Sequence, residues 1–248
     1  MSADLVVLPA RRAHSNYAEV ARTLAIDIIS GRLAHMQKLP GDAELMLRFG
    51  VSRPVLRESV KTLVAKGLLT TKARVGTVVR QRSAWNMFDT DVLSWHLQAG
   101  IDGRFLRDLA EIRLAVEPHA AALAAFRRND AHIDAMRAGL AQMERESSNS
   151  TGFADGDLAL HLAVASASGN AFMRSVGSVI DAALRASFLL SAPIEPGDRE
   201  QVLKMHGEII DAIAGRNAEE AAAAMTACIH NGLRRHGAAG KQTNFDKP

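Results

Sequence analysis

The sequence predicts a mostly α-helical protein with an N-terminal winged helix-turn-helix domain and a C-terminal all-helical antiparallel bundle. Two short amphipathic segments meet at a tight turn within residues 39–69, and a hairpin-like alternation follows at 70–79. Beyond residue 100, apolar residues recur at helical spacing in segment after segment. At 248 residues, 48% apolar and 23% charged, the chain is long enough for two domains that each bury a core.

The first elements are a tail, expected to be flexible to about residue 15, and a helix over 17–30. In the next helix, Leu45 and Leu47–Phe49 are expected to supply the apolar contacts, and Gly50 provides the turn. Ser52 precedes the following helix and is expected to cap it through its hydroxyl. This order is typical of a helix-turn-helix.

The helix after this turn carries a basic face. Arg53, Arg57 and Lys61 recur every fourth residue, while apolar side chains follow another face. An arginine at the start of such a helix can read guanine in a DNA major groove. The alternative is a solvated amphipathic helix, but the hairpin that follows reads as a wing, with Lys72 and Arg74 near its tip to contact phosphates.

Charge is divided unevenly along the chain. Residues 1–82 hold 14 lysines and arginines against 6 acidic residues, a net of +8, and the remainder carries −5. The basic part is therefore suited to a polyanion. The single Cys228 excludes an internal disulfide, and the sequence has neither an apolar run near the ~20 residues of a membrane span nor a signal-like N-terminus. We expect a cytoplasmic protein with no membrane partner.

The turn chemistry predicts the domain limits. The winged domain is expected to span 1–82, a linker 83–100 with a short helix at 91–100, the bundle 101–236, and a disordered tail 237–248. Six bundle helices are predicted over 103–128, 131–147, 151–168, 171–191, 198–215 and 218–236.

The helical part contains residues that suit a metal ion. Asp157 and His161 lie four residues apart on one predicted helix, so their side chains share a face. His206 shares its face with several isoleucines and is expected to be buried, and Cys228 is expected to point inward more readily than His230. A carboxylate, two imidazoles and a thiolate would suit zinc or another divalent transition metal. The alternative is that each histidine is a satisfied core residue.

Two arginines lie among apolar residues in the same part. Arg113 and Arg185 are each interpreted as a buried cation that could take an anionic ligand. The alternative for both is an ion pair with a helix carboxylate such as Glu111, Glu117 or Asp181.

With these residues in view, the whole chain resembles GntR-family transcription regulators of the FadR subgroup. In the N-terminal half the matching positions are Gly31, Leu39, Pro40, Glu44, Leu45, Phe49–Arg53, Arg57, Glu58, Leu63, Gly67, Leu68, Gly76 and Thr77. In the C-terminal half the matching segments are EIRLAVEP, D-x(3)-H at Asp157 and His161, SGN, and MHGEIIDAIAGRNAEEAAAAM. The segment WNMFDTDVLSWHL is similar to the linker of regulators of sugar-acid catabolism.

The residue pattern and the resemblance together give the candidate site residues, with the roles of Arg53, Arg57, Asp157, His161, His206 and Arg113 implied by the resemblance. The DNA-binding candidates are Arg48, Ser52, Arg53, Arg57, Lys61, Arg74, Gly76 and Thr77; Arg48 stands in for the basic residue that many relatives have where this chain has Ala43. The effector-binding candidates are Arg113, which is expected to hold a carboxylate, Asp157, His161, Arg185, His206 and Asn231. The metal candidates are Asp157, His161, His206 and Cys228, with His230 as an alternative; the family's third histidine aligns with Cys228.

These observations predict a homodimeric repressor of sugar-acid catabolic genes. It would bind a pseudo-palindromic operator in double-stranded DNA and release it when a small carboxylate or sugar acid, such as galactonate or gluconate, binds the bundle. A divalent metal, most simply zinc, is the candidate cofactor, and the alternative is a site that binds the sugar acid directly without a metal. No catalytic residue is expected. Two alternatives stay open at this point: a metal-dependent hydrolase with a DNA-binding appendage, and an effector-independent architectural DNA-binder.

Overall fold

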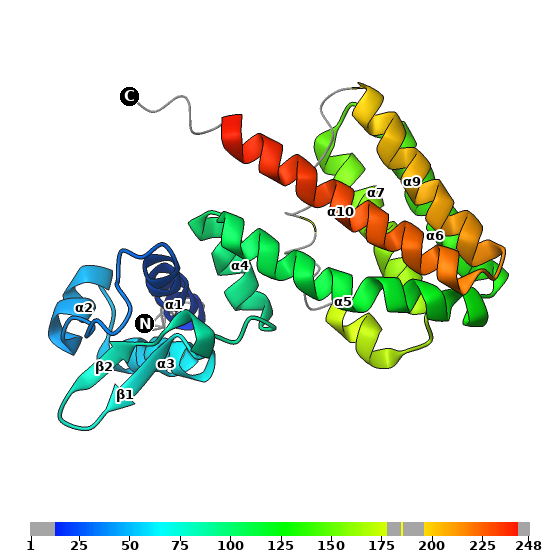
Figure 1. Cartoon of the computed structure of the whole chain (residues 1–248). Coiled ribbons are helices and arrows are strands. Elements are labelled where there is room, and N and C mark those ends of the chain that lie inside the picture. Colours follow the sequence, from blue (N-terminus) through cyan, green and yellow to red (C-terminus); the bar gives the residue numbers. More distant parts are fainter. Residues whose placement is uncertain (1–12, 178–184, 186–195, 243–248) are drawn as a thin grey trace, which may run out of the picture. The chain divides into compact units, whose positions relative to one another are not determined.

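The computed structural model describes residues 13–177, 185 and 196–242 and divides the chain into two compact units, residues 1–100 and 101–248 (Figure 1). The first unit contains α1 (Ala13–Ile29), α2 (Asp42–Phe49), α3 (Arg53–Ala65), β1 (Leu69–Lys72), β2 (Gly76–Val79), a 3-10 turn (Arg82–Ala84) and α4 (Thr90–Ala99). The second contains α5 (Gly103–Arg127), α6 (Asp130–Arg145), α7 (Ser150–Ala167), α9 (Pro196–Ala214) and α10 (Ala218–Gln242). The predicted fold class is confirmed.

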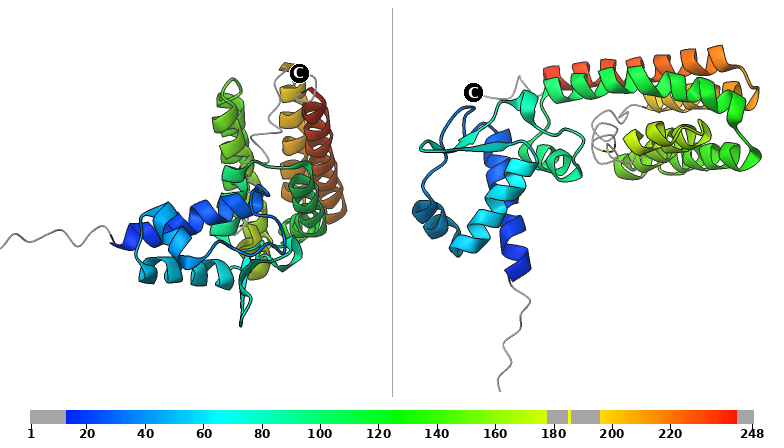
Figure 2. Two further views of the ribbon diagram at one scale, coloured as in Figure 1. Left: turned by 90° about the vertical axis from the view of Figure 1, so that its left-hand side faces the viewer. Right: turned by 90° about the horizontal axis from the view of Figure 1, so that it is seen from below.

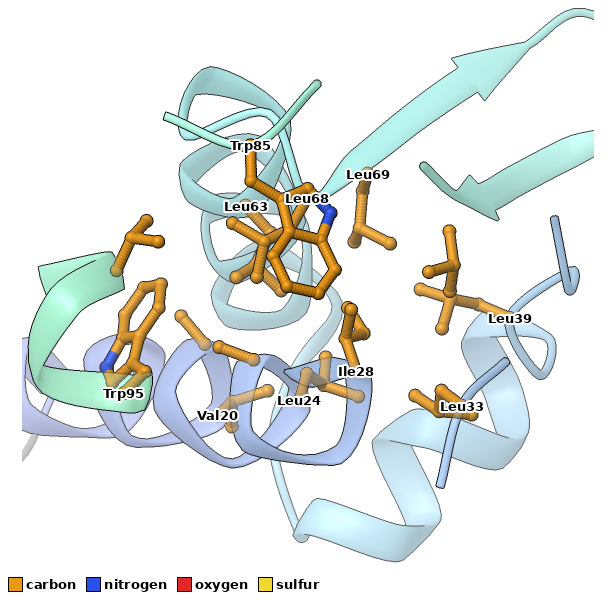
Figure 3. Packing of buried hydrophobic residues seen from close by; sticks show 14 of the residues in the cluster. Val20, Leu24, Ile28, Leu33, Leu39, Leu63, Leu68, Leu69, Trp85 and Trp95 are labelled. Carbon is orange, nitrogen blue, oxygen red and sulfur yellow. The ribbon is translucent and has the colours of Figure 1, made fainter. Parts of the chain in front are cut away.

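The core of the first unit lies between α1, α3 and the sheet (Figure 3). Leu24, Ile28 and Leu63 are fully buried there. Trp85 and Trp95 join the same core, although both belong to the predicted linker 83–100. The segment buries two large aromatic side chains and so forms part of the first unit.

Two side-chain predictions in the helix-turn-helix are wrong. Leu47 does not contact the core: it is 85% exposed, and Leu45 is the buried residue of α2. Ser52 occupies the N-cap position of α3, but its hydroxyl makes no capping hydrogen bond. An N-cap side chain accepts from the backbone N–H of the second or third helical residue. The second helical residue here is Pro54, which has no N–H. Gly50 makes the turn as expected, with φ 62°.

The wing is an antiparallel hairpin in which Leu69 pairs with Val79 and Lys72 with Gly76. Arg74 lies in the loop with φ 61°, so the backbone turns at the residue expected to reach DNA. Figure 2 shows the hairpin extending away from the helices of its unit. A bridge between Lys38 and Val78 ties the segment before α2 to the wing.

The second unit is an antiparallel bundle in which α5 packs along α10 and α6 against α7 (Figures 1 and 2). Residues 171–177 are helical, and most of the predicted helix 171–191 lies outside the described residues. The last helix continues to Gln242, so residues 237–242 are helical where a disordered tail was expected.

Close helix packing positions α7. Gly139 on α6 faces Gly156 on α7, and a Cβ built on Gly156 would lie 2.8 Å from the backbone nitrogen of Met143. The two backbones therefore approach more closely than side chains would allow. The side chain of Asn149 caps the first turn of α7 by accepting from the backbone N–H of Thr151. None of the helices that the structure describes is long and apolar enough to cross a membrane.

Candidate DNA interface and candidate metal centre

The first turns of α3 present the basic residues predicted for DNA binding. Arg53 is the first residue of the helix, and both it and Arg57 are exposed. Lys61 is exposed on the same helix, but its ammonium lies 2.8 Å from a carboxylate oxygen of Glu58. An exposed pair of this kind is weak, so it leaves Lys61 able to exchange partners.

Arg48 is held by contacts within its own unit. Its guanidinium lies 2.7 Å from Asp27 and 4.9 Å from the ring centroid of Phe49. Arg32 donates to the other oxygen of Asp27, also at 2.7 Å. Burial alone would raise the pKa of Asp27, but the hydrogen bonds from Arg48 and Arg32 outweigh it and lower that pKa. A DNA contact by Arg48 would therefore have to compete with Asp27.

The wing residues have different surroundings. Arg74 is exposed at the loop, and Gly76 has φ 102°. A Cβ on Gly76 would come within 2.9 Å of the Lys38 side chain, so glycine allows that lysine to lie across the hairpin. Thr77 accepts a backbone hydrogen bond from the N–H of Leu39 through its carbonyl.

Three helices of the second unit bring the metal candidates together. Asp157 and His161 lie on α7, His206 on α9 and Cys228 on α10, and all four side chains are buried. Asp157 Oδ1 lies 3.1 Å from His206 Nε2 and 3.2 Å from His161 Nε2. Cys228 Sγ lies 3.6 Å from His206 Nε2. The ligand atoms of His161, His206 and Cys228 lie within 4.8 Å of one another.

These separations fit a divalent metal ion. In a tetrahedral zinc site, nitrogen and oxygen ligands lie about 2.1 Å and sulfur about 2.3 Å from the ion. Two ligand atoms at about 2.1 Å are then about 3.4 Å apart, and a nitrogen and a sulfur are about 3.6 Å apart. The oxygen-to-nitrogen and sulfur-to-nitrogen distances in the cluster are close to these values. The donor set of one carboxylate, two imidazoles and one thiolate is also one that zinc accepts.

The charges in the cluster also favour a divalent metal ion. Burial opposes every charge here, yet the histidines lower the pKa of Asp157 and lower that of Cys228 to about 6. Burial likewise opposes protonation of His206, but Cys228 and Asp157 raise its pKa to about 10. The buried anions thus need nearby positive charge, and two imidazole protons supply it. One divalent ion would supply the same charge to neutral imidazoles.

A second layer of contacts surrounds His161. Its Nδ1 lies 2.7 Å from Glu117 Oε2, and Glu117 Oε1 accepts a hydrogen bond from Arg113 Nε at 2.7 Å. Burial would raise the pKa of Glu117, but Arg113 and His161 lower it to about 2. The ion pair between Arg113 and Glu117 is one of the alternatives that the sequence left open.

The structure separates two other candidates from this cluster. Arg185 is exposed and pairs with Asp155 at 2.5 Å, so the interpretation of Arg185 as a buried cation is wrong. His230 is exposed, because it lies on α10 two residues past Cys228 and so on a different face of that helix. It therefore lies outside the group of ligand atoms formed by His161, His206 and Cys228.

Sequence reasoning missed Arg235, which lines a pocket beside the cluster and contacts Asn231. Asn231 is buried and accepts a hydrogen bond from Arg235, one turn further along α10. A pocket there is lined by Arg113, Asp157, His161, His206, Cys228, Gly232 and Arg235. The signal for Arg235 is its position one heptad after Cys228, which places both side chains on one face of α10. The sequence indicates Glu117 only as an ion-pair partner of Arg113.

Comparison with known proteins identifies the family. The profile described as "Bacterial regulatory proteins, gntR family" matches residues 16–79, and that of the FCD domain matches residues 108–231. The chain belongs to the GntR family of bacterial regulatory proteins. Its N-terminal unit is the family's DNA-binding helix-turn-helix domain, and its C-terminal unit is an FCD domain.

Relatives within the GntR family match along most of their length. The galactonate operon transcriptional repressor of Escherichia coli is 30% identical over 213 residues, which cover 86% of this chain and 93% of the relative. The HTH-type transcriptional regulator LutR of Bacillus subtilis is 28% identical over 210 residues, 82% of this chain and 93% of the relative.

A solved structure supports the fold alone. The regulator Lar, which controls the expression of the Listeria monocytogenes agr system, aligns with a TM-score of 0.60 at 20% identity, covering 90% of this chain and 96% of that one. The family members are transcriptional regulators, so this protein is a transcriptional regulator and the hydrolase alternative is excluded.

Proposed function

We propose that this GntR-family regulator is a homodimeric repressor that binds a divalent metal, most simply zinc, and releases its operator when a sugar acid binds. The observation that carries the proposal is the buried cluster of His161, His206 and Cys228 ligand atoms within an FCD domain. Asp157 completes the donor set. When bound, the ion would supply a positive centre for a carboxylate oxygen.

Operator recognition is assigned to the exposed start of α3 and to the wing. Arg53 and Arg57 would enter the major groove. The hydroxyl of Ser52, which makes no capping hydrogen bond, would lie near the phosphates. Lys61, Arg74, Gly76 and Thr77 would add backbone contacts. One recognition helix makes too few base contacts for useful specificity, so we propose a dimer that reads a pseudo-palindrome.

The effector site is assigned to the pocket beside the cluster. It combines the metal candidates with the guanidinium of Arg235 and the amide of Asn231 that contacts it. Arg113 also lines this pocket, with its guanidinium bound to Glu117. Cations and hydrogen-bond donors in a buried pocket suit a carboxylate. The relative that represses the galactonate operon favours a sugar acid of that kind.

Release of DNA requires that the effector bind the two states of the dimer differently. A hundredfold loss of operator affinity corresponds to ~2.7 kcal/mol of coupling between the two sites. The sugar acid must therefore favour a dimer arrangement in which the two recognition helices no longer match the half-sites.

The DNA assignment is tested by fluorescence anisotropy with the promoter region next to the protein's own gene and a random duplex of equal length. We expect the wild type to prefer the promoter at moderate salt. Arg53→Ala should lose ~1–3 kcal/mol of discrimination between the two duplexes. The matched control is Arg104→Ala, an exposed arginine of α5 outside the DNA-binding domain. Equal binding of both duplexes by the wild type would refute the operator assignment.

A further inference from the structure

The side chain of His161 is oriented by the carboxylate of Glu117, which contacts the ring nitrogen that does not face Asp157. Glu117 Oε2 lies 2.7 Å from Nδ1, whereas Nε2 of the same ring faces Asp157 at 3.2 Å. An ionised carboxylate only accepts hydrogen bonds, so Nδ1 must carry the proton. Without metal, Nε2 also carries a proton and donates it to Asp157; when a metal displaces that proton, the neutral ring presents its lone pair at Nε2, toward the cluster.

His206 is oriented in the same sense by another kind of partner. Its Nδ1 donates to the backbone carbonyl of Val202 at 2.8 Å, and its Nε2 faces Asp157. Both imidazoles therefore offer Nε2 to one point. For His206 the orienting group belongs to the helix backbone, whereas for His161 it is a side chain that can be replaced.

Arg113 fixes Glu117 in turn. Its Nε lies 2.7 Å from Oε1 and its Nη2 3.3 Å from Oε2, and the two residues are one turn apart on α5. Arg113 is only 7% exposed. An effector carboxylate at Arg113 would have to compete with a buried carboxylate that already contacts two of its nitrogens.

We propose that Glu117 is a positioning residue that selects the Nδ1–H tautomer of His161 for metal binding, and that Arg113 holds Glu117 in place. This inference rests on the proposed metal centre. It gives Arg113 a task other than the direct grip on the effector carboxylate that the family resemblance implies. Partners of this type behind a ligating histidine typically change metal affinity 10- to 100-fold.

Glu117→Gln tests the inference, because the amide has the same size but no charge. It has only one acceptor oxygen for both His161 and Arg113, so one of them must face its NH2 group. We expect the zinc dissociation constant of the full-length protein, measured by competition with a chromophoric chelator, to rise by ~10- to 100-fold. Glu111→Gln, an exposed residue of the same helix, is the matched control and should bind zinc as the wild type does.

A second measurement shows directly which nitrogen of the His161 ring carries the proton. In zinc-loaded protein labelled with 15N-histidine, long-range proton–nitrogen NMR distinguishes the nitrogen that carries a proton from the one that binds metal. The wild type should show His161 as one Nδ1–H species, and Glu117→Gln should show a mixture. Glu117→Asp keeps the charge but shortens the reach to Nδ1, so it should weaken zinc binding too, and it serves if the glutamine variant does not fold.

The outcomes separate this inference from the proposed function. Unchanged zinc affinity in both Glu117 variants would overturn the positioning role and leave the metal centre standing. Arg113→Gln should also weaken zinc binding; normal zinc affinity with loss of galactonate binding would instead return Arg113 to the effector. A wild-type protein that binds no zinc would remove the metal centre and this inference with it.

Discussion

Cys228 is the residue whose chemistry distinguishes this cluster from an all-imidazole site. If its thiolate is a metal ligand, Cys228→Ser replaces a strong ligand by a weak hydroxyl. We expect the zinc dissociation constant to rise by at least ~10-fold, measured by chelator competition. Cys228→His, which restores the imidazole that the family resemblance implies at this position, should keep zinc bound.

His230→Gln provides the control for that prediction, because His230 is exposed on the same helix. It should leave zinc affinity unchanged. If Cys228→Ser binds zinc as tightly as the wild type, the thiolate is not a ligand and the donor set must be completed in another way.

At the residue scale, the sequence predicts positions within one helix better than partners between helices. The spacing of Asp157 and His161 places them on one face of a helix. The partner of Arg185 is Asp155 on α7, thirty residues earlier in the sequence, so no spacing rule indicates it. The contact of Glu117 with His161 was missed for the same reason, because it joins α5 to α7.

At the scale of elements, the close contact between α6 and α7 predicts that Gly156 cannot be enlarged without loss of stability. Gly156→Ala adds a methyl group where the nearest atoms are backbone, 2.8 Å away. Overpacking of this kind should lower the free energy of unfolding by ~1–3 kcal/mol in urea titrations. Gly207→Ala is the matched control: its Cβ would have no neighbour within 4 Å, so the higher helix propensity of alanine should stabilise by up to ~1 kcal/mol. Equal stability of both variants would show that the two backbones lie further apart.

The ion pair between Asp27 on α1 and Arg48 on α2 predicts that the stability of the first unit depends on pH. The pKa of Asp27 is lowered in the folded protein, so its ion pairs stabilise the fold above the ordinary carboxyl range near ~3.9. That contribution is lost as the pH falls through the lowered pKa. At pH 7, Asp27→Asn should therefore cost ~1–3 kcal/mol in thermal unfolding, and its difference from wild type should shrink below pH 4.

Glu44→Gln, an exposed substitution in the same unit, should be nearly neutral throughout. A difference between Asp27→Asn and wild type that stays constant down to low pH would contradict the ion-pair explanation.

Element boundaries were predictable where turn residues mark them. The predicted limits of the helices from α5 to α7 lie within two residues of those observed, because Gly, Asn and Ser mark the breaks. The burial of individual side chains was not predictable in the same way. Leu47 is apolar but exposed, and Trp85 lies in a segment that reads as a linker yet packs into the core, since both outcomes depend on which elements meet in space.

The proposal of a pseudo-palindromic operator requires two copies of the 26.6 kDa chain. We expect sedimentation equilibrium to give a species of about 53 kDa, twice the chain mass, at micromolar concentration. One dimer should bind each promoter duplex. A monomer that binds promoter DNA with full specificity would contradict the two-fold arrangement.

Control of DNA binding by an effector can be measured as the promoter affinity of the zinc-loaded protein with and without a panel of sugar acids that includes galactonate and gluconate. We expect at least one acid to weaken promoter binding by about a hundredfold, which is ~2.7 kcal/mol of coupling. Asp157→Asn should bind the promoter but lose that response. Promoter affinity that no acid changes, in a protein that folds and binds DNA normally, would contradict an effector-controlled repressor and favour the architectural DNA-binder.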